Sequence, residues 1–151
     1  MLKRHNLALA KGLLLHWTRQ LYRRRSELAV IAFAGRHARV LQAPQRVAAF
    51  NERWIEPIGG GGGSPVASGL ALAEQLLRQA RRAAPGKHLQ LWLLSDGRFA
   101  QLPARPQGAD RCVVVDFDNA AVPLGRAAQL ARLWQAEYLR AAELLVGGAP
   151  R

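Results

Sequence analysis

Three short, almost uninterrupted apolar runs constrain the fold of this chain more than any other feature of its sequence. They are Leu28–Phe33, Leu89–Leu94 and Cys112–Val115, and polar or turn-forming residues bound each of them. Runs of this length, apolar at nearly every position, are typical of parallel strands that are buried on both faces. We therefore expect three buried strands at the centre of the molecule.

Helical patterns separate these strands. Residues 7–24 carry apolar side chains at steps of three and four, and a leucine-rich helix is predicted over residues 124–145. A third helix is predicted to start at Ser64-Pro65 and to run to about Ala84, with an inward face of Val66, Leu70, Ala73, Leu77 and Ala80. The alternation predicts a Rossmann-like three-layer α/β/α fold with a mostly parallel sheet. We place one domain at residues 1–146 and a flexible tail at residues 147–151.

The shorter segments complete this outline. His37–Leu41 alternates like a half-exposed strand that Pro44 would end. Val47–Ile55 is expected to be a short helix, and Phe99–Asp110 a loop rich in proline and glycine. Cys112, the single cysteine, is predicted to be a buried thiol, so no internal disulfide forms and the location is expected to be cytoplasmic.

Two features point to the edge of the sheet where its strands end, which is where ligands bind in open parallel sheets. Asp96 lies just past an apolar strand, and the Gly59–Gly63 run leads to Ser64 at a helix start. A carboxylate and a hydroxyl suit a hard cation such as Mg²⁺. The alternatives are an ordinary Asp-Gly turn and a flexible glycine linker.

Six short motifs follow one another along the chain in a characteristic order. They are Ala10-Lys11-Gly12, Leu21-Tyr22-Arg23-Arg24-Arg25, Leu28–Gly35, Gly61-Gly62-Gly63-Ser64-Pro65-Val66-Ala67-Ser68-Gly69-Leu70, Leu93-Leu94-Ser95-Asp96-Gly97-Arg98 and Val114-Val115-Asp116. Over almost the whole chain this order resembles the von Willebrand factor A-type domain at the end of the D subunit of magnesium and cobalt chelatases. The glycine run with Ser64-Pro65, together with Ser95-Asp96-Gly97-Arg98, is the most specific part.

The resemblance implies a metal-ion-dependent adhesion site that serves for docking and not for catalysis. In such domains a carboxylate of a partner protein completes the coordination of a divalent ion. By this resemblance Ser64 takes the place of a threonine ligand and Asp96 that of an aspartate ligand of Mg²⁺. Gly63 and Asp116 are candidates to support these ligands; Asp116 with Asp118 could position metal-bound water or could simply cap a loop.

The start of the chain departs from the family. The family's first motif, Asp-x-Ser-x-Ser-Met, would place its methionine at Met1, so the strand before it and the metal ligands on that strand are missing. In the family this strand lies between those that match Leu28–Phe33 and Leu89–Leu94, and each unpaired buried backbone group would cost about 1–3 kcal/mol. One hypothesis is that the natural protein begins upstream of Met1. The rival is a reduced domain, which the helix-free loop Phe99–Asp110 favours.

The function implied by the resemblance is that of an accessory, non-catalytic subunit of an ATP-dependent metal chelatase, which inserts magnesium or cobalt into a tetrapyrrole. Its partners would be an AAA+ ATPase subunit and the large chelatase subunit. One alternative is a von Willebrand A partner of a MoxR-type AAA+ chaperone. Another is a basic binding module without metal.

The charge and composition of the chain bear on which of these functions is possible. Nineteen arginines and three lysines against ten acidic residues give a net charge of +12, which fits an acidic partner or a solvated surface. No strand interleaves aromatic and basic residues, which argues against nucleic acid. No apolar run approaches the ~20 residues of a membrane span. The four histidines show no ligand spacing, and neither a Ser-His-Asp set nor a phosphate-binding loop is present.

Overall fold

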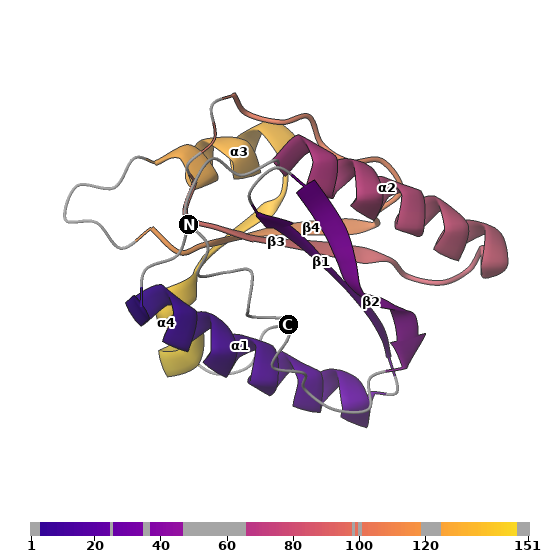
Figure 1. The fold of residues 1–151 in the computed structure, drawn as a ribbon, viewed down its shortest axis with the longest axis horizontal. Coiled ribbons are helices and arrows are strands. Elements are labelled where there is room, and N and C mark those ends of the chain that lie inside the picture. The colour runs from indigo at the N-terminus through magenta and orange to yellow at the C-terminus, as the bar shows by residue number, and fades with distance from the viewer. Residues whose placement is uncertain are drawn as a thin grey trace.

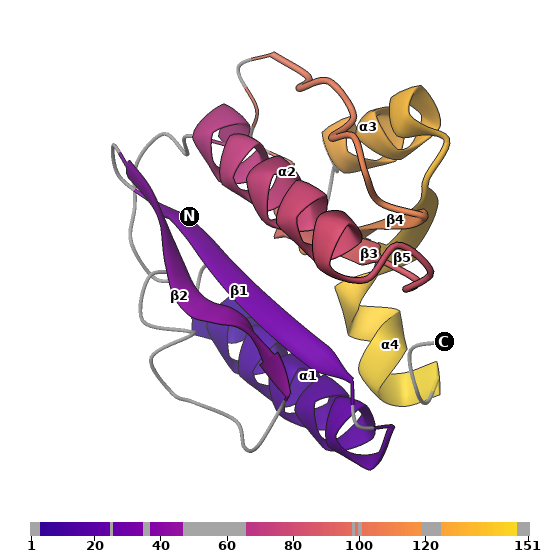
Figure 2. The same ribbon diagram turned by 90° about the vertical axis from the view of Figure 1, so that its right-hand side faces the viewer.

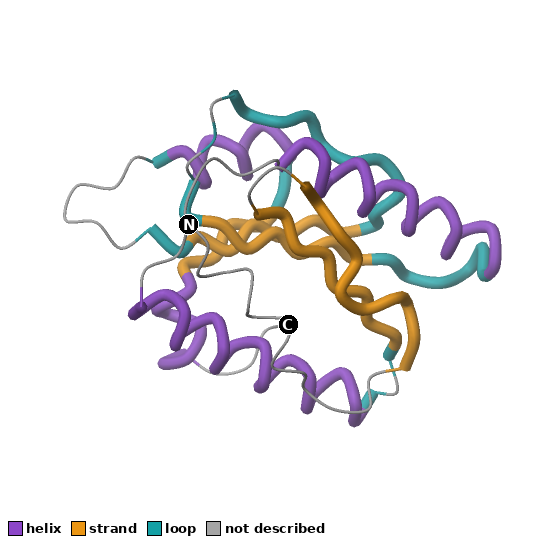
Figure 3. Tube along the Cα trace, viewed as in Figure 1, coloured by secondary structure: helices purple, strands orange, loops and turns teal. Residues whose placement is uncertain are grey.

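The computed structural model describes residues 4–24, 26–34, 37–46, 66–97, 99, 101–118 and 125–147. The strands lie in a middle layer, with α2 and α3 on one side and α1 and α4 on the other (Figure 1 and Figure 3). In chain order the elements are α1 (Arg4–Arg23), β1 (Glu27–Ala34), β2 (His37–Arg46), α2 (Val66–Ala83), β3 (Gln90–Ser95), β4 (Arg111–Asp116), α3 (Arg126–Trp134), β5 (Glu137–Arg140) and α4 (Ala141–Gly147). The predicted α/β class is confirmed, and the layering is compatible with a Rossmann-like fold.

A three-stranded parallel sheet in the order β3-β4-β5 forms the centre. Its middle strand, β4, is the predicted run Cys112–Val115, and residues 112–116 are all buried. Cys112 is a free thiol, as predicted, and burial raises its pKa. A strand with neighbours on both edges and helices on both faces has no polar side, which explains its continuous apolar sequence.

Alternate residues of β4 face two separate cores. Val114 belongs to a cluster with Leu70, Leu130 and Trp134 beneath α2 and α3. Val113 belongs to a second cluster with Ala10 and Leu13 of α1, next to α4 (Figure 2). Of the predicted inward residues of α2, Val66, Leu70, Ala73 and Leu77 are buried and Ala80 is partly buried. No helix in the described part of the chain is both long and apolar enough to cross a membrane.

The strand β1 differs from its prediction, because it pairs antiparallel with β2 and not parallel with a neighbour. Only residues 35 and 36 separate the two strands, and so short a connection allows only an antiparallel hairpin. The strand β2 also continues through Pro44, which was predicted to end it. Pro44 falls in an irregular stretch of the pairing, where proline is tolerated because its missing N–H is not required.

The prediction of one final helix over residues 124–145 is wrong. The helix α3 ends at Trp134, and Gln135 takes a left-handed conformation with φ 53°. Its N–H donates back to the carbonyl of Arg132 at 3.2 Å, which closes the helix. Residues 137–140 then pair with β4 as the short strand β5, so tertiary pairing overrides the helical pattern.

The hairpin and the parallel sheet remain separate sheets in the described part of the chain, because β1 pairs with β2 and β3 pairs with β4. The expected missing strand between β1 and β3 stays a prediction. The segments 47–65 and 119–124 lie outside the described residues, and with them the predicted helix Val47–Ile55.

Candidate functional site

The carboxyl end of β3 positions Asp96. Ser95, the last residue of the strand, is completely buried, and its Oγ accepts a hydrogen bond from the N–H of Gly97 at 3.1 Å. Gly97 has φ 82°, and a Cβ there would lie 3.2 Å from the backbone nitrogen of Ala127 in α3. Glycine is therefore required for the turn, which leaves Asp96 only 6% exposed at the edge of the sheet.

Asp116 lies at the same edge on the neighbouring strand. It is the register partner of Ser95, and the N–H of Phe117 donates to the carbonyl of Ser95 at 2.8 Å. Its Oδ1 accepts from the N–H of Asp118 at 2.8 Å, and its Oδ2 accepts from the hydroxyl of Tyr138. Both carboxylate oxygens of Asp116 therefore have donors within the protein, an arrangement that supports loop capping.

Tyr138 also contributes a side chain to this edge of the sheet, which the sequence analysis did not predict. Burial raises its pKa to about 12, and the hydrogen bond to Asp116 acts in the same direction. The phenol therefore stays neutral and donates to the carboxylate over the whole physiological range. Tyr138 was missed because it fell inside the predicted final helix, and no local pattern marks residues 137–140 as a strand.

The other half of the predicted site lies outside the described residues, because Gly63 and Ser64 precede the first residue of α2. The start of α2 is nevertheless placed. Val66 is buried in the same cluster as Leu93 of β3 and Ala127 of α3. The amino end of α2 therefore packs near the strand end that carries Asp96.

The described residues alone do not form a metal centre. No three His, Cys, Asp or Glu side chains among them are grouped so that they could hold one ion. Beside Asp96, Asp116 brings a second carboxylate to this edge, and its two oxygens accept hydrogen bonds from Asp118 and Tyr138. The proposed Mg²⁺ site would need Ser64 and further donors beyond the described part of the chain.

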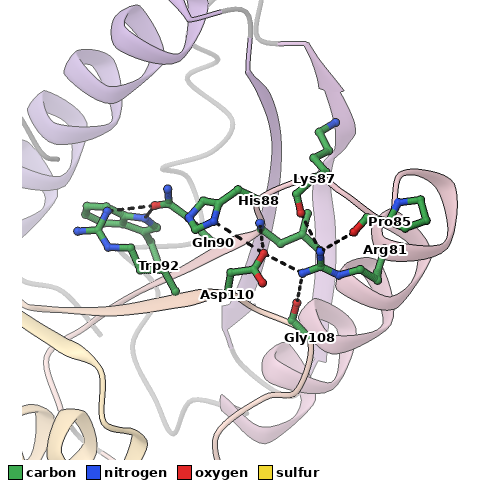
Figure 4. A network of polar contacts seen from close by, with 10 residues as sticks. Arg81, Pro85, Lys87, His88, Gln90, Trp92, Gly108 and Asp110 are labelled. Atoms are coloured by element: carbon green, nitrogen blue, oxygen red, sulfur yellow. Dashed lines mark hydrogen bonds and ion pairs between the residues drawn. The ribbon is translucent and has the colours of Figure 1, made fainter.

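A second polar cluster lies at the opposite, amino end of β3 and β4 (Figure 4). Asp110 Oδ2 accepts from Arg81 at 2.8 Å and from the N–H of Leu89 at 2.7 Å. Arg81 also donates to the carbonyls of Pro85 at 3.1 Å and Lys87 at 2.8 Å. The backbone N–H of Leu89 and the guanidinium of Arg81 hold the pKa of Asp110 below its ordinary value. This cluster ties the end of α2 to the start of the sheet.

The loop between β3 and β4 is fixed by contacts of its own. Trp134 donates its indole N–H to the carbonyl of Pro103 at 2.9 Å, and Arg105 donates to the carbonyl of Trp134 at 2.6 Å. The N–H of Gln107 donates to Glu74 of α2 at 2.8 Å. Residues 101–110 contain no helix, as predicted, and hydrogen bonds to α2 and α3 hold the loop in place.

Comparison with known proteins finds three that are similar in sequence to this chain. An uncharacterised protein of Mycobacterium tuberculosis is 32% identical over 95% of this chain. The magnesium-chelatase 60 kDa subunits of Cereibacter sphaeroides and Rhodobacter capsulatus are 33% and 31% identical, each over 88% of this chain. The chain spans only about a quarter of each relative, 25% of the first and 26% of the other two.

These similarities relate the chain in sequence to magnesium-chelatase subunits over most of its length. No family model matches the chain. No solved structure matches it either.

Proposed function

We propose that the chain is a docking domain of an ATP-dependent metal chelatase, of the von Willebrand A type, and not a catalytic subunit. The observation that carries this proposal is the similarity to two magnesium-chelatase 60 kDa subunits over 88% of the chain. The location of Asp96 supports it, because that carboxylate lies where parallel sheets bind their ligands.

The partners in this proposal are the AAA+ ATPase subunit and the large tetrapyrrole-binding subunit. The turn at Gly97 packs against the start of α3, which restricts the backbone next to Asp96. Ser64 and Asp96 would contribute oxygen donors to a Mg²⁺ ion, which would supply a positive charge that attracts a carboxylate of the partner.

Affinity capture from the natural host tests the proposal. The tagged full chain is incubated with the host's chelatase subunits in Mg²⁺ or in chelator, and the bound subunits are quantified. We expect Asp96→Asn to weaken capture by about thirtyfold or more, because loss of one member of a desolvated charge pair costs about 2–5 kcal/mol. Glu143→Gln is the matched control, because it removes one carboxylate whose side chain is 72% exposed on α4.

The outcomes separate the parts of the proposal. Equal capture in Mg²⁺ and in chelator would remove the metal dependence. Capture of a different AAA+ protein, with no chelatase subunit, would replace the chelatase by a chaperone system. Equal loss in Asp96→Asn and Glu143→Gln would show that Asp96 has no special part in docking.

A further inference from the structure

The carboxyl end of α1 and the residue after it carry a concentration of positive charge without acidic residues. Arg19, Arg23 and the following Arg24 are exposed, and Tyr22 among them is 62% exposed. The first acidic residue of the chain is Glu27, so none precedes it to offset these charges. Arg19 and Arg23 are four residues apart on one helix face, and the negative end of the helix dipole offsets their mutual repulsion.

These arginines differ from most other basic residues of the described chain, which have partners within the protein. Such partners are present for Arg78, Arg81, Lys87, Arg105, Arg111 and Arg126. In contrast, no ion pair or side-chain hydrogen bond joins Arg19, Arg23 or Arg24 to another described residue. Arg39, Arg82 and Arg132 also have none, but these three stand on separate elements.

The arginines lie at the end of the molecule opposite Asp96. In Figure 1 the carboxyl end of α1 lies toward the same side as the end of α2 and the start of β3. Asp96 follows the other end of β3. Lys87, which precedes β3, pairs with Glu27 at the start of β1 at 3.0 Å, so the nearest acidic residue along the chain is already neutralised.

Backbone hydrogen bonds and side-chain packing hold the carboxyl end of α1. The N–H of Arg24 donates to the carbonyl of Gln20 at 3.1 Å, and the N–H of Ser26 donates to that of Leu21 at 2.9 Å. On the other face of the helix, Leu13 is completely buried and Trp17 packs against Trp92, with ring centroids 5.0 Å apart. The apolar face of the helix is therefore packed against the rest of the molecule, and its arginines are on the exposed side.

We propose that Arg19, Tyr22, Arg23 and Arg24 form a second docking surface, for an acidic segment of a partner protein. It rests on the proposed function in one respect, because it would let the domain hold two partners at opposite ends. Guanidinium groups bind carboxylates bidentately, and arginine and tyrosine are enriched among residues that dominate protein interfaces.

The size of the surface favours protein over nucleic acid. Five residue steps of helix span about 7.5 Å, enough for a few carboxylates of one acidic segment. The steep salt dependence of nucleic-acid binding is found for proteins that make about 6–10 phosphate contacts. Three arginines with one tyrosine do not make a track of that length.

Peptide binding by two matched triple variants tests this surface. A fluorescent polyglutamate peptide is titrated with the full chain at low salt, and the anisotropy gives Kd. We expect Arg19→Gln, Arg23→Gln, Arg24→Gln to raise Kd about tenfold, since exposed charge pairs contribute modestly. The control Arg39→Gln, Arg82→Gln, Arg132→Gln removes the same charge from dispersed positions and is expected to raise Kd no more than about twofold. Thermal unfolding checks that both variants fold.

Each other outcome would overturn the proposal. Equal losses in both triple variants would mean that net charge alone attracts the peptide. An unchanged Kd in the α1 variant would place the binding elsewhere, and absence of wild-type binding would remove the surface. Tighter binding of an RNA of equal charge, lost in the α1 variant, would assign the surface to phosphate. The peptide-binding assay contains no chelatase subunit, so its results are independent of the capture experiment with Asp96→Asn.

Discussion

Two aspartates lie at neighbouring strand ends of the parallel sheet. Asp96 directly follows β3 and Asp116 is the last residue of β4, and each aspartate is 6% exposed. Their positions could be predicted from sequence, because each closes an apolar run with a charged residue. The hydrogen bond from Tyr138 to Asp116 could not be predicted, because Tyr138 lies on β5, twenty-two residues further along the chain.

The hydrogen bond from Tyr138 to Asp116 can be measured by titration. Tyr22 and Tyr138 are the only tyrosines, so Tyr22→Phe leaves Tyr138 as the sole source of tyrosinate absorbance. We expect that absorbance to appear with a pKa of about 12. In Asp116→Asn the pKa should fall toward the ordinary value of about 10, with part of the rise kept because burial is the larger cause.

The sign of the stability effect follows from the same pKa. Because the folded pKa of Tyr138 is raised, its contribution to stability is complete below about pH 10 and is lost as the pH rises toward 12. An unchanged pKa in Asp116→Asn would mean that the tyrosine does not donate to this carboxylate.

At the scale of elements, sequence patterns identified the segments that bury an apolar face. They missed the features that depend on pairing with another strand. The helices α1 and α2 and the strands β3 and β4 appear within a few residues of their predicted ranges. The strand β5 was missed because its four residues continue the helical spacing of α3, and only pairing with β4 makes them extended. The antiparallel partner of β1 was missed because apolar content does not encode strand direction.

The junction of α2, β3 and the loop before β4 depends on one carboxylate, that of Asp110. The pKa of Asp110 is lowered by the N–H of Leu89 and by Arg81. Its contribution to stability is therefore present above the unfolded value of 3.8 and is lost as the pH falls through the lower folded pKa. We expect Asp110→Asn to be less stable than wild type at pH 7 and to lose less stability on acidification.

Urea unfolding at pH 7 and at about pH 3 measures this difference, with Glu143→Gln as the control for loss of one exposed carboxylate. If Asp110→Asn showed the same pH dependence as wild type, Asp110 would not contribute to the acid sensitivity of the fold.

At the scale of the whole molecule, the layers were predictable and the division into two sheets was not apparent from patterns alone. Each apolar run predicts a strand, and the helices predicted between the runs indicate that helices cover both faces of the sheet. Which strands share a sheet depends on pairing across distant segments. In the described part of the chain, β3 has β4 on one edge, while β1 is paired with β2 alone.

Hydrogen exchange tests the outer edge of β3. The carbonyls of Leu89 and Ser95 accept from Arg111 and Phe117, so alternate residues, with Leu91 and Leu93, bond toward β4. The N–H groups of Trp92 and Leu94 point to the other edge. We expect these two to exchange roughly tenfold or more faster than those of Leu91 and Leu93. Equal protection would mean that another backbone segment pairs along β3.

The outer edge of β3, with which no strand in the described part of the chain pairs, also affects how copies of the molecule behave together. If hydrogen exchange finds the backbone groups of this edge unpaired, they are a template on which another copy can add a strand. The net charge of +12 opposes such an approach, since like-charged copies repel one another. Salt shortens the range of that repulsion to about 10 Å at 0.1 M. In concentrated solution, ionic strength and not the shape of the edge would therefore set how readily copies associate.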